Sequence, residues 1–161
     1  MAIKVGDKVP NVTLRIMGQD GKPATVTTEE LFKGKRVVLF ALPGAFTPTC
    51  SRAHLPGYVV QADVIKAKNV DQIACLSVND AFVMHAWGKD QNVDGNILML
   101  ADGSAEFTKA IGLDDDRTAN GMGIRSRRYA MLVEDGVVKV LNVEQPGEFK
   151  VSDAETILKV L

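Results

Sequence analysis

The run from Arg36 to Leu42 limits the possible folds of this chain more than any other segment. Every residue after the arginine is apolar. A strand with one face in water alternates apolar and polar residues, whereas a strand covered on both faces is apolar throughout. Ile73–Val78 has the same character, interrupted only by Ser77. Two such strands predict a sheet with helices on both faces, which places the chain in the α/β class.

Periodicity and turn signals predict further elements around these two strands. Val12–Ile16 alternates and is followed by turn-forming residues, which predicts an edge hairpin. Asp135-Gly136 is the turn of a second, late hairpin. Other strands are expected at Ile97–Leu100, Tyr129–Val133 and Val137–Val143. Helices are expected at Leu31–Lys33 after a Thr27/Glu30 capping box, from Cys50 to Lys68 with a kink or break at Pro56, from a cap at Asp80 through Trp87, over Ser104–Ile111, and from Ser152 to the C-terminus after a Ser152/Glu155 capping box.

Length and charge narrow the class of protein. With 161 residues, 46% of them hydrophobic, the chain is expected to form a single domain, residues 1–161, around one core. Its 19 Lys and Arg against 20 Asp and Glu leave a net charge of −1, so no general attraction to nucleic acid is expected. No apolar run approaches the roughly 20 residues of a membrane span, and Met1–Asp7 has no apolar signal core. We therefore expect a soluble cytoplasmic protein that binds neither nucleic acid nor membranes.

Two cysteines, Cys50 and Cys75, are too few for a disulfide framework, so each is a packing residue, a redox group or a nucleophile. Cys50 follows a loop that Pro43 and Pro48 stiffen, at the expected start of a helix. Free N–H groups and the helix dipole at such a position stabilise a thiolate, the nucleophilic form. Thr47 could accept a bond from a reacting O–H group and donate to the thiolate. The alternative is that Cys50 is simply a small buried residue.

Other candidate sites have little support. His54 and His85 are 31 positions apart and lack the spacing of a helical zinc motif, so no metal site is expected. Gly121–Gly123 lacks the third glycine of a dinucleotide-binding fingerprint, and there is no Cys-x-x-Cys motif of the thioredoxin type. The large aromatic residues in the middle of the chain are expected in the core: Phe46, Phe82 and Trp87.

Pro43–Ser51 resembles the peroxidatic motif P-x-x-x-T-x-x-C of the peroxiredoxins, in the form found in the plant type II and related bacterial and mitochondrial enzymes. The similarity spans nearly the whole chain. It is carried further by Lys4–Asp7, His54–Gly57, Cys75–Phe82, Leu100–Gly103 and Arg127–Met131. The resemblance implies a thioredoxin-like fold, with a central mixed sheet flanked by helices and an N-terminal β-hairpin extension. It also implies reduction of hydrogen peroxide and organic hydroperoxides by a cysteine, without a metal or organic cofactor.

The resemblance implies roles for four residues. The peroxidatic cysteine of the family falls on Cys50, its hydroxyl group on Thr47, its loop-shielding proline on Pro43 and its arginine on Arg128. An arginine stays protonated and presents a fork of donors, so Arg128 can stabilise the thiolate and hold a peroxide. Residue type alone does not distinguish Arg128 from the other arginines of this basic stretch, since most such residues are solvated surface groups.

Cys75 has apolar neighbours and is expected to be a packing residue, although some type II members have a resolving cysteine at the matching position. The other resolving position of the family lies near the C-terminal helix. Here that stretch, Phe149–Asp153, has no cysteine, and Ser152 is interpreted as a helix cap. We therefore expect an external thiol to reduce oxidised Cys50: glutathione or a glutaredoxin, with thioredoxin as an alternative donor.

Two functions remain open on the sequence. The first is an antioxidant thiol peroxidase, in which peroxide oxidises Cys50 to a sulfenic acid that glutathione or glutaredoxin reduces. The second is a non-catalytic redox sensor or partner-binding module switched by oxidation of Cys50. The presence of Thr47 and Arg128 favours turnover, because a sensor could keep the cysteine and lose the others. A homodimer is expected, because the family places the segments that match Phe46 and Phe82 at its subunit contact.

Overall fold

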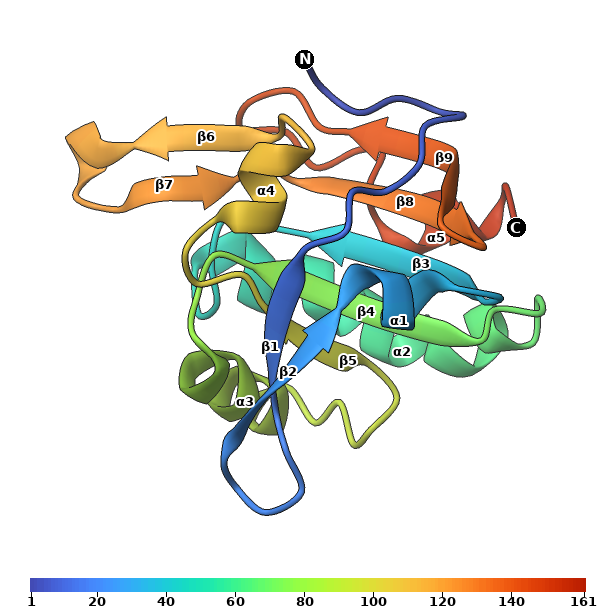
Figure 1. Cartoon of the computed structure of the whole chain (residues 1–161), viewed down its shortest axis with the longest axis horizontal. Helices are drawn as coiled ribbons and strands as arrows, with labels where there is room; N and C mark the ends of the chain where they lie inside the picture. Colours follow the sequence, from blue (N-terminus) through green and yellow to red (C-terminus); the bar gives the residue numbers. More distant parts are fainter.

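The computed structural model describes every residue from Met1 to Leu161 (Figure 1). Its main sheet has seven strands in the order β2-β1-β5-β4-β3-β8-β9, and β6 and β7 form a separate two-stranded ribbon. The strands are β1 (Thr13–Met17), β2 (Pro23–Thr27), β3 (Arg36–Ala41), β4 (Gln72–Ser77), β5 (Leu98–Ala101), β6 (Asp114–Arg117), β7 (Gly123–Ser126), β8 (Tyr129–Glu134) and β9 (Val137–Val143). The helical segments are α1 (Thr28–Phe32), the π-helical turn η1 (Cys50–His54), α2 (Leu55–Lys66), α3 (Ala81–Asp90), α4 (Glu106–Ala110), the 3₁₀ turn η2 (Thr118–Asn120) and α5 (Ala154–Leu158).

Strand β3 lies in the interior of the sheet, as its apolar run predicts. It pairs parallel with β4 and antiparallel with β8, while β4 pairs parallel with β5. Its side chains divide between two apolar clusters. Val38 and Phe40 pack with α2, α3 and α5 on one face, whereas Val37 and Leu39 pack with α1 and α4 on the other. Figure 1 shows these layers, with α1 and α4 in front of the sheet and α2 behind it. The predicted α/β class and mixed sheet are confirmed.

Local signals placed both hairpins correctly. β1 and β2 pair antiparallel, and β1 joins the rest of the sheet through β5, so this hairpin extends one edge. β8 and β9 are joined at Asp135-Gly136, where both residues have left-handed φ values of 48° and 80° that a tight turn of this kind requires. Thr27 and Asp80 cap α1 and α3 as predicted, each accepting a backbone N–H of the first turn.

Two helix predictions need correction. The helix expected over Ser104–Ile111 is shorter, because Ala105 has a left-handed backbone with φ 58° and helical geometry begins only with α4. The last helix begins after Asp153, whose carboxylate accepts the Thr156 N–H. Ser152 is therefore not the helix cap that its spacing suggested.

The β6–β7 ribbon was not predicted. Strand β6 is Asp114-Asp115-Asp116-Arg117, and aspartate is depleted in strands, so the local preference argues against this element. The ribbon projects from the main sheet in Figure 1. It forms one side of the pocket described below.

The core prediction for aromatic residues is confirmed in one case and wrong in two. Trp87 is fully buried, whereas Phe46 is 54% exposed and Phe82 is 62% exposed. Phe46 also has a positive φ of 64°, which is unfavourable for a bulky residue and turns its side chain outward from the loop after β3. None of the helices is both long and apolar enough to span a bilayer.

Candidate active site

Cys50 lies on the first turn of the helical segment that follows the loop after β3. Helical backbone begins at Pro48. Proline has no N–H, but the first residues of a helix have no intrahelical acceptor for one, so no hydrogen bond is lost. From Cys50 the turn is of the π type, closed by the Leu55 N–H donating to the Cys50 carbonyl. Short π-helical segments inside helices are frequent at functional sites. The predicted break at Pro56 is found one residue earlier, as the change from π-helical to α-helical geometry.

Arg128 reaches the thiol from a distant part of the sequence. It directly precedes β8, and the antiparallel pairing of β8 with β3 brings it to the strand end from which the Cys50 loop departs. One terminal nitrogen of Arg128 donates to Cys50 Sγ at 3.2 Å. The other lies 2.8 Å from His54 Nδ1. Because a guanidinium remains protonated, the contact places a permanent positive charge against the sulfur.

His54 holds this guanidinium in place, and Tyr58 shares the backbone carbonyl to which His54 is bonded. Burial, together with the charge of Arg128, lowers the pKa of His54 to about 3, so the imidazole is neutral at pH 7. Arginine only donates, so Nδ1 of His54 is the acceptor and Nε2 carries the hydrogen. That hydrogen is donated to the Ser152 carbonyl at 3.1 Å, and the Tyr58 hydroxyl donates to the same oxygen at 2.7 Å.

Sequence reasoning missed His54 as a site residue, because it tested the histidines only as metal ligands. The available signal was its position four residues after Cys50, which puts both side chains on one helical face. No group of three or more His, Cys, Asp and Glu side chains is arranged to hold a metal ion.

Glu144 anchors the chain segment that supplies the Ser152 carbonyl. Its side chain accepts the backbone N–H groups of Lys150, Val151 and Ser152 and the Ser152 hydroxyl, at 2.7 to 2.9 Å. Burial opposes ionisation, but the hydrogen bonds from Lys150, Ser152 and Val151 outweigh it, so the pKa of Glu144 lies below its ordinary value. Ser152 thus connects Glu144 to His54 rather than starting a helix.

Thr47 and Pro43 border the thiol, but Thr47 is not bonded to it. The Thr47 hydroxyl donates to the Gly44 carbonyl at 2.7 Å, not to Cys50 as expected. Its lone pairs remain available to accept an O–H from a peroxide. The Pro43 carbonyl accepts from Arg125, which also reaches the Val78 carbonyl and braces the loop. Arg125 is therefore a loop contact, distinct from the thiol contact of Arg128.

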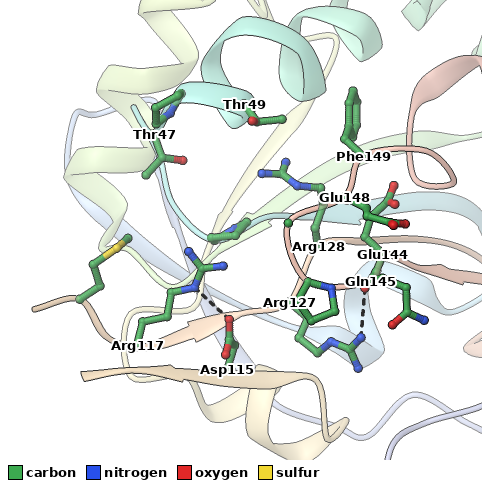
Figure 2. Close-up of a pocket in the computed structure, with 15 residues that line it drawn as sticks. Thr47, Thr49, Asp115, Arg117, Arg127, Arg128, Glu144, Gln145, Glu148 and Phe149 are labelled. Atoms are coloured by element: carbon green, nitrogen blue, oxygen red, sulfur yellow. Dashed lines mark hydrogen bonds and ion pairs between the residues drawn. The ribbon is translucent and has the colours of Figure 1, made fainter. Parts of the chain in front are cut away.

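A pocket of about 420 Å³ opens beside these groups (Figure 2). Pro43, Thr47 and Arg128 all contribute to its wall. In Figure 2 the Arg128 guanidinium extends between Thr49 and Phe149, and the Phe149 ring centre lies 5.7 Å from its central carbon. Cys50 itself is fully buried, so its sulfur lies behind the wall and in contact with Arg128. The structure therefore brings all four predicted site residues together.

Cys75 lies on β4 and packs in the same apolar cluster as Cys50. It is fully buried, and burial, with a smaller effect of Cys50, raises its pKa well above the usual range. Cys75 is thus a protonated thiol in the core, as expected for a packing residue. The two cysteines are unpaired.

A thiol held by a permanent cation can attack a small electrophile that enters the adjoining polar pocket. Together with the fold, this chemistry defines a class of oxidoreductase: thiol-dependent enzymes of the thioredoxin-like superfamily.

Comparisons with known proteins narrow the class to a family. The family model described as Redoxin matches residues 4–158. The chain is 53% identical over 163 residues to Peroxiredoxin-2E-2, chloroplastic, of Oryza sativa subsp. japonica, covering 99% of this chain and 72% of that protein. It is 50% identical over 164 residues to the hybrid peroxiredoxin hyPrx5 of Haemophilus influenzae, covering 100% of this chain and 67% of that protein. Reduced Prx3 of Vibrio vulnificus, crystallised in complex with hydrogen peroxide, superposes with a TM-score of 0.94 at 59% identity over 98% of each chain.

The chain therefore belongs to the peroxiredoxin family and has its thioredoxin-like fold. Its activity is that of a thiol peroxidase, which works through a peroxidatic cysteine. This favours the enzyme over the non-catalytic sensor among the two functions that the sequence left open.

Proposed function

We propose that Cys50 is the peroxidatic cysteine, that hydrogen peroxide and organic hydroperoxides oxidise it, and that glutathione or a glutaredoxin reduces it. The observation that carries the proposal is the 3.2 Å hydrogen bond from Arg128 to Cys50 Sγ. Cys75 has no such contact, and burial keeps it protonated. The relative from Vibrio vulnificus was crystallised with hydrogen peroxide, which supports the same substrate here.

In the first half-reaction the Cys50 thiolate attacks one peroxide oxygen. The S–O bond forms as the O–O bond breaks, which gives a sulfenic acid and releases a water or an alcohol once the leaving oxygen takes up a proton. Arg128 can donate to the oxygen on which charge develops, because its fixed fork of donors already lies at the sulfur. The Thr47 hydroxyl accepts the O–H of the incoming peroxide, and Pro43 shields the thiol from bulk water.

In the second half-reaction an external thiol attacks the sulfenic sulfur. A mixed disulfide forms and water leaves; a second thiol then attacks this disulfide, releasing an oxidised thiol pair and the Cys50 thiolate. Two features support an external donor. The only other cysteine is a buried, protonated core residue, and Ser152, in the C-terminal stretch, is bound to Glu144. Because Cys50 is buried, the loop or η1 must open locally before a thiol reaches the sulfur.

The proposed cycle uses side chains and thiols alone, without a metal or organic cofactor, so peroxidase activity should withstand chelators. Since it depends on a supply of reduced thiols, we further propose that the protein works in the reducing environment of the cytoplasm.

We also propose a homodimer. Phe46, in the loop after β3, and Phe82, in the first turn of α3, are large, exposed apolar residues. The segments that carry them are tied together by the Ala45 N–H, which donates to Asn79 Oδ1 at 3.0 Å. Exposed aromatic residues on adjoining segments suit a symmetric contact. Sedimentation of the wild type should give about twice the mass of one chain, and Phe82→Asp should give one chain mass at the same concentration. A monomeric wild type at micromolar concentration would exclude the dimer.

The function is tested by following peroxide consumption with glutathione, with glutaredoxin plus glutathione, and with thioredoxin. Cys50→Ser should abolish consumption, whereas the matched change Cys75→Ser should retain most of it. Intact mass after one equivalent of peroxide and glutathione should show one adduct, absent from Cys50→Ser. Wild-type turnover by Cys50→Ser refutes the assignment of the nucleophile, and a rapid Cys50–Cys75 disulfide without an adduct refutes the external reductant.

A further inference from the structure

The pocket beside Cys50 is larger than its peroxide substrate requires. A water molecule occupies about 30 Å³ in the liquid, so hydrogen peroxide, with two oxygens, would fill only a minor part of the 420 Å³ volume. That volume falls within the ~300–1,000 Å³ typical of sites for small organic ligands. Only two of its 15 lining residues, Met122 and Phe149, are hydrophobic apart from the prolines. The excess space therefore suits a polar molecule better than the alkyl chain of an organic hydroperoxide.

The charges around the pocket are unevenly compensated. Asp115 is paired with Arg117 at 2.9 Å, Glu148 with Lys150 at 3.5 Å, and Glu144 is surrounded by backbone N–H donors. Arg127, by contrast, has no carboxylate partner. Its one side-chain hydrogen bond goes to the Glu144 carbonyl at 3.0 Å, although a guanidinium has five N–H donors.

Arg117 is a second source of donors. Its ion pair uses Nε, which leaves the two terminal NH₂ groups without a protein acceptor. In Figure 2, Arg117 lies on the β6 side of the pocket and Arg127 on the side of Glu144 and Gln145. Two guanidiniums thus line different parts of one pocket, and each has donors to spare. This arrangement fits a ligand that carries two carboxylates.

We propose that Arg127, together with Arg117, forms a carboxylate-binding subsite for the reducing thiol, which holds glutathione or the glutathionyl part of a mixed disulfide beside Cys50. Glutathione has a carboxylate at each end of the molecule and its thiol between them. Arginine is suited to this role because its planar fork matches a carboxylate in bidentate geometry. The glutathione ammonium group can face Asp115 or Glu148. This inference rests on the proposed use of a glutathione-derived thiol as reductant.

The subsite is tested first without turnover, by calorimetric titration of the reduced wild-type protein with S-methylglutathione, which keeps both carboxylates and cannot react. Arg127→Gln should weaken binding about tenfold, the effect of losing one hydrogen-bonded charge partner. The affinity of Arg127→Lys should lie between those of the wild type and Arg127→Gln, because lysine keeps the charge but lacks the planar fork of donors. Lys139→Gln removes the same charge from an exposed position on β9 outside the pocket and serves as the matched control. If Arg127→Gln does not fold, the same titration is made with Arg117→Gln.

The kinetic test compares glutathione with its diethyl ester, in which both carboxylates are masked, as reductants of the pre-formed Cys50 sulfenic acid. The ratio of the two rate constants should favour glutathione in the wild type and fall about tenfold in Arg127→Gln. An unchanged ratio, or equal binding of S-methylglutathione by wild type and variant, overturns the subsite even where glutathione supports turnover. Arg127-dependent binding without any turnover on glutathione supports the subsite and refutes the proposed reductant.

Discussion

Replacing Glu144 by glutamine tests whether the anchored segment behind the thiol maintains the active site. The change keeps the shape of the side chain and removes its charge. The glutamine oxygen can take the place of Oε2 and accept from Val151 and Ser152. The Lys150 N–H lies 2.9 Å from both carboxylate oxygens, so the NH₂ group that replaces Oε1 then faces this N–H. Two donors would therefore face each other in a partly buried position.

The magnitude follows from the hydrogen bonds that change. Four donors, three backbone N–H groups and the Ser152 hydroxyl, meet the carboxylate of Glu144. Hydrogen bonds to charged groups contribute about 1.5–3 kcal/mol each and neutral ones about 0.5–1.5, so the loss is roughly 1 kcal/mol per donor. Relief from burying a carboxylate offsets part of this sum. We expect Glu144→Gln to lower the free energy of unfolding by about 2–3 kcal/mol.

The effect should depend on pH in a defined direction. The folded state lowers the pKa of Glu144 below its ordinary value of 4.5. Its stabilisation is therefore fully present above that value and is lost as the pH falls through the lower, folded-state pKa. The difference in stability between wild type and Glu144→Gln should be full at neutral pH and shrink below pH 4.5.

Urea unfolding at a series of pH values measures this difference. Glu148→Gln is the control, because Glu148 lies on the same loop and has only an exposed pair with Lys150 at 3.5 Å, which contributes at most about 1 kcal/mol. Stopped-flow oxidation of the thiol should also be slower in Glu144→Gln, because displacing a catalytic group by ~1 Å costs up to about a hundredfold in rate. Equal stability of the two variants, or a difference that stays constant down to pH 3, would refute the reasoning about Glu144.

Three further tests probe the groups around Cys50 and the apolar cluster on the other face of the sheet. Arg128→Met and Thr47→Val should each slow peroxide attack at least about a hundredfold, the effect of losing one preorganised donor. Arg128→Met should also reduce the ultraviolet thiolate absorbance. Unchanged rates in both variants would contradict the roles of Arg128 and Thr47. The pKa of His54 falls from 6.5 to about 3 on folding, so the free energy of unfolding of the wild type should decline as the pH drops from 6.5 towards 3. In urea titrations, His54→Phe should remove the part of this decline that comes from His54. Tyr129 Oη is buried without a hydrogen-bond partner, so Tyr129→Phe should raise the free energy of unfolding by about 1 kcal/mol and shift the urea midpoint upward. A lower midpoint would show that the hydroxyl has a partner.

Much of the scaffold could be predicted from short stretches of sequence. The apolar run of β3 identified an interior strand, and Asp135-Gly136 identified a tight turn, because both depend on residues close together in the chain. The position of Cys50 at a helix start after such a strand was predicted for the same reason. Thr47 and Pro43 belong to the same short loop, so their proximity to the thiol also follows from local geometry.

The partners of the thiol were decided by the tertiary structure. Arg125, Arg127 and Arg128 are close in sequence, yet the first braces a loop, the second faces the pocket and the third binds the sulfur. Arg128 is 78 positions from Cys50, and only the pairing of β8 with β3 brings the two together. Family resemblance pointed to Arg128, the arginine that contacts the sulfur, but no local pattern did.

Contacts between residues that no local pattern connects also explain the remaining errors of prediction. Ser152 has the spacing of a helix cap, but a buried carboxylate eight residues earlier in the chain binds its N–H and hydroxyl instead. Phe46 and Phe82 are apolar, yet the positive φ of one and the helix-start position of the other leave both exposed. Local sequence determined which elements form, since their hydrogen bonds close within a few residues. Only the packed chain decided which side chains meet, because those contacts join residues whose separation in sequence carries no periodic signal.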